Sequence, residues 1–308
     1  MTKILALTKR NCLLFLRSKA TFFFSLFSSL IMIALYFLFI AKLYAQGFNE
    51  MAGTQLSSNQ LYFAIYSQMI MGVLVLNSVS LSTGVFTFVA QDLEKRKVDA
   101  FLLARTKPSQ LILSYLFSSL IISFALNFVT LALSVIIIGA ATTFWISAGT
   151  FFYLVGALIV ITIISCAVML LITILVRTSA AIGVINGIMG TILGFLCGIY
   201  MPYSNLGSAA KYVGSCLPFT HMTIWLKQIM LNDVFGQFGM SAEVSEVMKD
   251  TWFSAGNVGF VGLNVPLWGM LLISAAFGVG CLIVAVLLLK RRMLNPKIKL
   301  KRREKKSA

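Results

Sequence analysis

The stretch Thr150–Val176 (TFFYLVGALIVITIISCAVMLLITILV) contains no charged residue over its whole length. A helix needs about 20 apolar residues to cross about 30 Å of bilayer hydrocarbon, so this stretch is long enough. In lipid a long apolar run favours a helix, because a helix pairs its backbone polar groups internally. Strands of membrane barrels are shorter and alternate apolar with polar residues, unlike this stretch. The stretch therefore predicts a transmembrane helix.

Five other stretches have the same character, and together the six predict an all-α membrane protein with six transmembrane helices. They are Ala20–Ala41, Leu61–Ala90, Leu111–Ala140, Ala181–Tyr200 and Pro266–Leu289. Over all 308 residues, 59% are hydrophobic, only 11% are charged, and the mean hydropathy is +0.94. A soluble domain has about a quarter charged residues, and a disordered chain is rich in charge and poor in apolar residues. The composition therefore excludes both of these classes.

Basic segments flank the six stretches. The apolar residues of the first segment can share one helical face while Arg10 and Arg17 lie elsewhere, which predicts an amphipathic helix in the membrane interface. We expect a single transmembrane domain over residues 1–308, made of this interface helix (1–19), a six-span core (20–289) and a basic cytoplasmic tail (290–308).

The distribution of charge predicts the orientation in the membrane. The chain has 25 Lys and Arg against 9 Asp and Glu, a net charge of +16. If both termini are inside, the outer segments hold only Lys42, Lys211, Lys227 and Lys249. Cytoplasmic loops are enriched in Lys and Arg, so we expect a cell-membrane protein with both termini in the cytoplasm. The basic charge is thereby assigned to orientation and to anionic lipids, and we expect no nucleic-acid partner.

Several kinds of chemistry have no motif in this sequence. A phosphate-binding G-x-x-x-x-G-K-[ST] loop, an H-E-x-x-H motif and a G-x-S-x-G motif are all missing, and His221 is the only histidine. The six predicted spans contain no Asp or Glu, which argues against a proton- or sodium-coupled carrier and against a membrane enzyme. We therefore expect no catalytic residue, metal site or cofactor in this chain, and an energy source on another subunit.

The charged segment Gln91–Gln110 between the second and third spans predicts a short amphipathic helix on the inner side. Val98, Phe101 and Leu102 recur at helical spacing, and Pro108 favours a break after the helix. From the residues alone, a solvated loop that only anchors the topology is an equally good interpretation.

The long outer segment Met201–Val265 contains an apolar piece, Leu217–Leu226, that is too apolar for a free loop and too short to cross the membrane. We expect this piece to be re-entrant or interfacial. Pro202 and Pro218 would shape the re-entrant backbone of the outer segment, and His221 would be a structural polar residue at the interface.

The fifth predicted span has a series of small residues. Its glycines recur every three or four residues, which allows a neighbouring helix to approach closely. They are Gly183, Gly187, Gly190 and Gly194. A seam with a second copy and packing within the chain are both compatible with this pattern.

Three motifs resemble those of the ABC-2-type transporter permeases. The inner segment resembles their coupling helix, whose pattern runs roughly E-K-G-T-x-E-x-L-L with a proline several residues on. Arg96 stands in place of the usual Gly, and Lys97 in place of the usual Thr. Gly198–Pro202 resembles the family's G-[IV]-x-x-P segment, and Leu217–His221 resembles its L-P-x-[TS]-[YH] stretch. The positions of the inner segment that match are Glu94, Lys95, Asp99, Phe101, Leu102 and Pro108.

The resemblance implies the membrane subunit of an ATP-driven exporter in a bacterial cell membrane. Two such chains, identical or paralogous, would join two cytoplasmic ABC ATPase subunits that bind ATP and Mg. The inner helix would dock on the ATPase, and the N-terminal helix with Arg10 and Arg17 would lie against the inner leaflet or the same ATPase. The docking residues that we infer are Glu94, Lys95, Arg96, Asp99, Phe101 and Leu102. The alternative function is a non-transporting membrane anchor for a partner ATPase in signalling or resistance.

Overall fold

The computed structural model describes residues 2–42, 44–45, 56–104, 106–176, 178–200, 206–240, 242–251, 259–260 and 263–294. Nearly all of these residues are helical, which confirms the all-α fold class. The helices are α1 (Thr2–Arg17), α2 (Lys19–Leu35), the π-helix η1 (Tyr36–Ile40), α4 (Ser58–Glu94), α5 (Lys97–Leu103), α6 (Pro108–Thr142), α7 (Ala148–Val176), α8 (Ser179–Leu196), α9 (Ser208–Ser215), α10 (Pro218–Gln237), α11 (Ala242–Thr251) and α12 (Leu267–Leu294). Two short strands, β1 (Gly259–Phe260) and β2 (Leu263–Asn264), pair antiparallel.

Five helices of the described chain are long and apolar enough to cross a membrane, and they coincide with five of the predicted spans. These helices are α4, α6, α7, α8 and α12. The remaining predicted span, Ala20–Ala41, is formed by α2, which has 17 residues, and by η1, which follows it directly. The count of six spans stays a prediction. A π-helix is a rare, widened turn that is frequent at functional sites.

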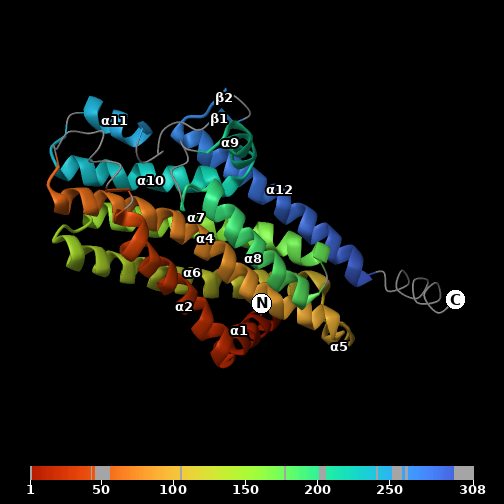
Figure 1. The fold of residues 1–308 in the computed structure, drawn as a ribbon. Coiled ribbons are helices and arrows are strands. Elements are labelled where there is room, and N and C mark those ends of the chain that lie inside the picture. The colour runs from red at the N-terminus through yellow and green to blue at the C-terminus, as the bar shows by residue number, and fades with distance from the viewer. Residues whose placement is uncertain are drawn as a thin grey trace.

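The centre of the bundle is α4, with α6 and α7 side by side along it (Figure 1). Polar side chains join α4 to α6 inside this apolar core. Asn77 Nδ2 donates to Asn127 Oδ1 at 3.1 Å and to Thr130 Oγ1 at 3.2 Å. Asn127 Nδ2 donates to the backbone oxygen of Leu74 at 3.0 Å. Such bonds hold transmembrane helices together, because lipid offers no competing partner for the amides.

The bundle has two ends that differ in structure. α5 lies at one end and α11 at the other, and these are called the α5 end and the α11 end below (Figure 1). α1 folds back from α2 at Ser18, whose φ and ψ of −77° and 77° are not helical, and packs against α6. The N-terminal helix is thus part of the bundle and does not lie wholly apart from it.

Helix α10 is longer and more buried than the sequence predicted. The expected segment ended at Leu226, whereas the helix runs for 20 residues and packs against α4, α7 and α12. Ser274 Oγ of α12 donates to the backbone oxygen of Pro218 at 3.1 Å, which fixes the start of α10. The prediction was too short because Lys227 and Asp233 interrupt the apolar run, while the helical backbone continues past both.

Candidate functional site

The chain makes a sharp corner between α4 and α5. α4 ends at Glu94, and Arg96 takes a left-handed conformation with φ of 55° before α5 begins at Lys97. Pro108 is the first residue of α6, so the predicted break after the short helix is confirmed. Glycine reaches the left-handed region without strain. The corner therefore explains why the family pattern has Gly at the position of Arg96.

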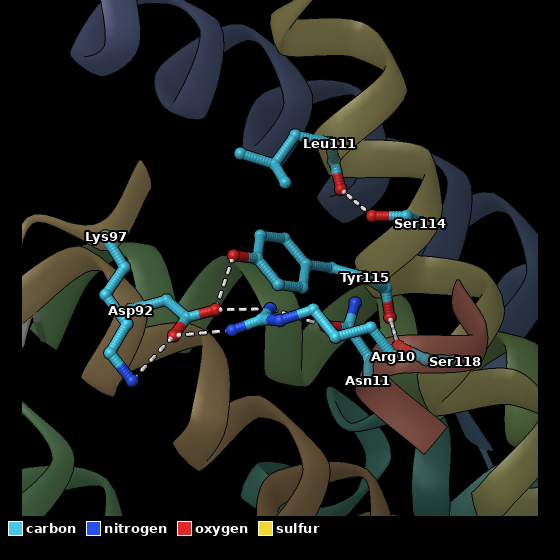
Figure 2. Close-up of polar contacts among 8 residues, drawn as sticks. All are labelled: Arg10, Asn11, Asp92, Lys97, Leu111, Ser114, Tyr115 and Ser118. Atoms are coloured by element: carbon cyan, nitrogen blue, oxygen red, sulfur yellow. Dashed lines mark hydrogen bonds and ion pairs between the residues drawn. The ribbon is translucent and has the colours of Figure 1, made fainter. Parts of the chain in front are cut away.

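A buried carboxylate, Asp92, connects three neighbouring helices at this corner (Figure 2). Arg10 of α1 donates to both carboxylate oxygens, at 3.0 and 3.4 Å. The Tyr115 hydroxyl of α6 donates to Oδ2 at 2.9 Å, and Lys97 Nζ of α5 lies 3.9 Å from Oδ1. The Asp92 side chain is 6% exposed, and burying a carboxylate costs free energy. The positive charges of Arg10 and Lys97 offset that cost.

The inner face of α5 packs onto this polar cluster. Val98 is buried, and the Phe101 ring lies under the Arg10 guanidinium, with 4.9 Å between the Cζ atom and the ring centroid. Arg10 therefore contacts Asp92 on one side and an aromatic face on the other, an arrangement that favours a cation. As a result α1, α4, α5 and α6 form one connected corner, and a displacement of α5 would act on α1 directly.

The outer face of α5 is exposed. Asp99 and Ala100 are exposed, and the Leu103 side chain is 86% exposed, the largest exposed fraction among the large apolar residues that the structure describes. Lys95 and Arg96 are exposed beside it. An exposed leucine surrounded by charges on a short, anchored helix is suited to docking on a partner protein.

The predicted docking residues thus separate into two groups. Lys95, Arg96 and Asp99 are exposed, whereas Phe101 and Leu102 are half-buried against the chain's own core. Glu94 is exposed but accepts from Ser179 at the start of α8, from the backbone nitrogen at 3.3 Å and from Oγ at 3.0 Å.

Sequence reasoning missed Asp92, Tyr115 and Leu103. Asp92 is the first charged residue after the apolar run of the second predicted span, which was the available signal. Its partner Arg10 is 82 residues away, and no spacing rule joins the two. Leu103 follows directly after the apolar pattern of Val98, Phe101 and Leu102. The direction of its side chain depends on where α5 ends.

The two cations predicted for the N-terminal helix have different environments. Arg10 is half-buried in the Asp92 cluster and faces the chain itself. Arg17 is exposed at the last residue of α1. Only Arg17 is placed to meet a membrane or a partner in the way that the sequence suggested.

The residues predicted for the outer segment are also separated. Pro202 lies outside the described residues. Pro218 is buried at the first turn of α10, and His221 is fully buried with Nε2 at 2.7 Å from the backbone oxygen of Ser215. His221 therefore lies inside the bundle, where it joins α10 to the end of α9.

The predicted glycine series of α8 contains two different environments. An added Cβ at Gly183, Gly187 or Gly190 would meet nothing within 4 Å, so these three glycines are not needed for packing against the part of the chain that the structure describes. At Gly194 a Cβ would lie 2.0 Å from the Tyr200 ring, which shows that this glycine allows a close contact inside the chain. The seam with a second copy stays a prediction, and the first three glycines leave space for it.

One cation of the predicted outer segments is buried. Lys227 was counted among the few cations of these segments, and it lies in α10 with 2% of its surface exposed. Its Nζ donates to the backbone oxygen of Gly198, just past the end of α8, at 3.2 Å. The sequence did not predict this burial, because the apolar piece was taken to end at Leu226, one residue before Lys227.

These features define a multi-pass membrane protein with a compact helix anchored at one end of its bundle. The chain belongs to the ABC-2 type transporter family, whose family model matches residues 2–231 of the 308. The matched residues include the corner around Asp92 and the first part of α10, up to Leu231. Among curated proteins, comparison finds none that matches this chain.

Proposed function

We propose that this permease of an ABC transporter is the membrane subunit of an exporter that moves a substrate out of the cell. Two such chains, identical or paralogous, would combine with two cytoplasmic ABC ATPases that bind ATP and Mg. In the proposed topology of six spans, both termini and the α5 end face the cytoplasm. The positive-inside rule supports this orientation, since Lys95, Arg96, Lys97 and Lys107 cluster around α5.

The observation that carries the proposal is the contrast between the two faces of α5. The inner face is fixed to α1, α4 and α6 through Asp92, Arg10 and Phe101. The outer face presents Leu103, Asp99 and neighbouring cations. A short helix whose inner face is fixed to the bundle and whose outer face is exposed can transmit a rigid-body movement of a docked partner to the spans.

The open glycine face of α8 supports the second proposed partner. Gly183, Gly187 and Gly190 leave space that nothing in the described chain fills, and α8 is mostly exposed. A helix of a second permease could approach closely along this face.

The test is recovery of an ATPase subunit with the tagged chain from its native membrane in a mild detergent. We expect the wild-type chain to bring along a subunit with a phosphate-binding loop, and Leu103→Asp to lower its recovery at least about tenfold, because a desolvated apolar anchor is lost. Val247→Asp is the matched control. Val247 is 64% exposed on α11, another short helix, at the opposite end of the bundle.

The outcomes separate the alternatives. Equal recovery with both variants would show that α5 does not contact the ATPase. Recovery of the wild-type chain without any ATPase would remove the energy source and with it the exporter. An ATPase whose hydrolysis no transported compound stimulates would favour the non-transporting anchor.

A further inference from the structure

Lys227 is an unusual residue for the interior of a helical membrane protein. In the described part of the chain, Asp92 and Lys227 are the only Asp, Glu, Lys or Arg residues that are buried. The two ion pairs found among the described residues both involve Asp92, so Lys227 has no acidic partner there. Burying a charge is costly unless it is paired, and ionisable residues at membrane depth mark functional sites.

The groups around Lys227 are neutral. Its Nζ donates to the Gly198 oxygen at 3.2 Å, which uses one of its three N–H groups. The Cys197 thiol lies close by. A cation at the end of a helix also interacts favourably with the helix dipole. This capping role accounts for part of the stabilisation but leaves the charge without a counterion.

Irregular backbone surrounds this position on several sides. α8 ends at Leu196, Gly198 just past its end has φ of 65°, and the Ile199 and Tyr200 nitrogens both donate to the Gly194 oxygen at 3.0 Å. On the other side of this turn, Tyr36 of the π-helix η1 donates to the Ile199 oxygen. A Cβ on Gly72 of α4 would lie 2.6 Å from the Ile199 side chain. Interrupted helices that meet inside a membrane bundle are the places where transporters bind small charged ligands.

We propose that Lys227 binds an anionic group, a carboxylate, sulfonate or phosphate, of the compound that this permease moves. Lys227 is only 2% exposed and its Nζ is bonded to the Gly198 oxygen, so binding requires the turn of residues 197–200 to move aside. Phe195 is 44% exposed and its ring lies 5.1 Å from the Tyr200 ring, and these two side chains would contact the apolar part of the compound. The inference rests on the proposed transport function and adds the substrate class to it.

The test measures binding without ATP, so that it does not depend on the ATPase. The tagged chain, with whatever subunits accompany it, is placed in nanodiscs of zwitterionic phosphatidylcholine. Three probes with the same ring and chain length are compared: 1-pyrenebutyrate, 1-pyrenebutanol and 1-pyrenebutylammonium. Energy transfer from tryptophan to pyrene reports binding, and empty nanodiscs give the background.

Two variants distinguish the effect of the Lys227 charge from its effect as a cap of α8. Lys227→Gln keeps a donor for the Gly198 oxygen but removes the charge. Thr220→Val is the matched control, because Thr220 Oγ1 also donates to the end of α8, to the Leu196 oxygen at 3.4 Å, without carrying charge. We expect Lys227→Gln to weaken pyrenebutyrate binding about tenfold or more, as for a lost charge-assisted hydrogen bond. Binding of pyrenebutanol should not change, and Thr220→Val should bind pyrenebutyrate like the wild type.

Several results would overturn the inference. The inference fails if the wild-type protein binds pyrenebutyrate no more tightly than pyrenebutanol. This comparison uses the wild-type protein alone, so it does not depend on the folding of a variant. Equal effects of Lys227→Gln and Thr220→Val would reduce Lys227 to a helix cap. Failure to recover an ATPase would contradict the proposed exporter, but it would leave this binding measurement intact.

Discussion

Asp92 and Lys227 are both buried charged side chains, but their surroundings differ. Asp92 accepts hydrogen bonds from Arg10 and Tyr115 and pairs with Lys97, and this cluster joins α1, α4, α5 and α6. Lys227 receives no opposite charge within the described chain and contacts a backbone oxygen. The first charge is neutralised in place and serves the structure of one corner. The second charge has no counterion among the described residues and is held by a single backbone oxygen.

The comparison teaches that burial of a charge has no fixed meaning in this bundle. A compensated charge stabilises the fold as long as both partners are present, and removing one partner leaves an uncompensated charge. An uncompensated charge already costs free energy, and removing it relieves that cost. Neutralising variants at the two sites should therefore change the stability in opposite directions.

The largest expected effect is at the compensated site. Arg10→Met should lower the free energy of unfolding by about 2–3 kcal/mol, because it removes the closest counterion of a buried carboxylate while Lys97 remains farther away. Thermal unfolding in detergent, followed by circular dichroism, measures the change. The double variant Arg10→Met with Asp92→Asn should recover part of the loss, since the unpaired charge is gone. Strictly additive losses would show that the two residues do not interact.

Lys227→Met should have the opposite sign. We expect the protein to be at least as stable as the wild type, with a gain on the order of 1 kcal/mol, because methionine fills the same space without a charge. The same unfolding measurement applies. A loss as large as that of Arg10→Met would mean that the bond to the Gly198 oxygen outweighs the cost of burial, and the comparison between the two sites would fail.

The smallest expected effect concerns the backbone of the corner that holds Asp92. Arg96→Gly should raise the stability by a few tenths to about 1 kcal/mol, because a side chain in the left-handed region is strained while the greater freedom of glycine in the unfolded chain offsets part of the gain. Lys95→Gly is the control, since Lys95 has φ of −84° and gains nothing from glycine. If both variants lower the stability equally, the strain at Arg96 is negligible.

Local patterns in the sequence were reliable for single elements. The length of each apolar run predicted α4, α6, α7, α8 and α12, and Pro108 predicted where α5 gives way to α6. These features depend on residues that are near each other in the chain. Local patterns also explain why the extent of α10 was missed. A single lysine in an apolar stretch gives the same local signal whether it is buried or in a loop.

The sequence by itself determined the class of protein: the composition requires lipid around the chain, and the charge distribution predicts an orientation. The tertiary structure alone decided which charges meet. Arg10 reaches Asp92 across 82 residues, and Lys227 reaches Gly198 across 29, because the helices that carry them pack together. Hydrophobicity is a property of each residue and can be summed along a sequence. The compensation of a charge depends on distances of a few ångströms between elements, which the fold sets.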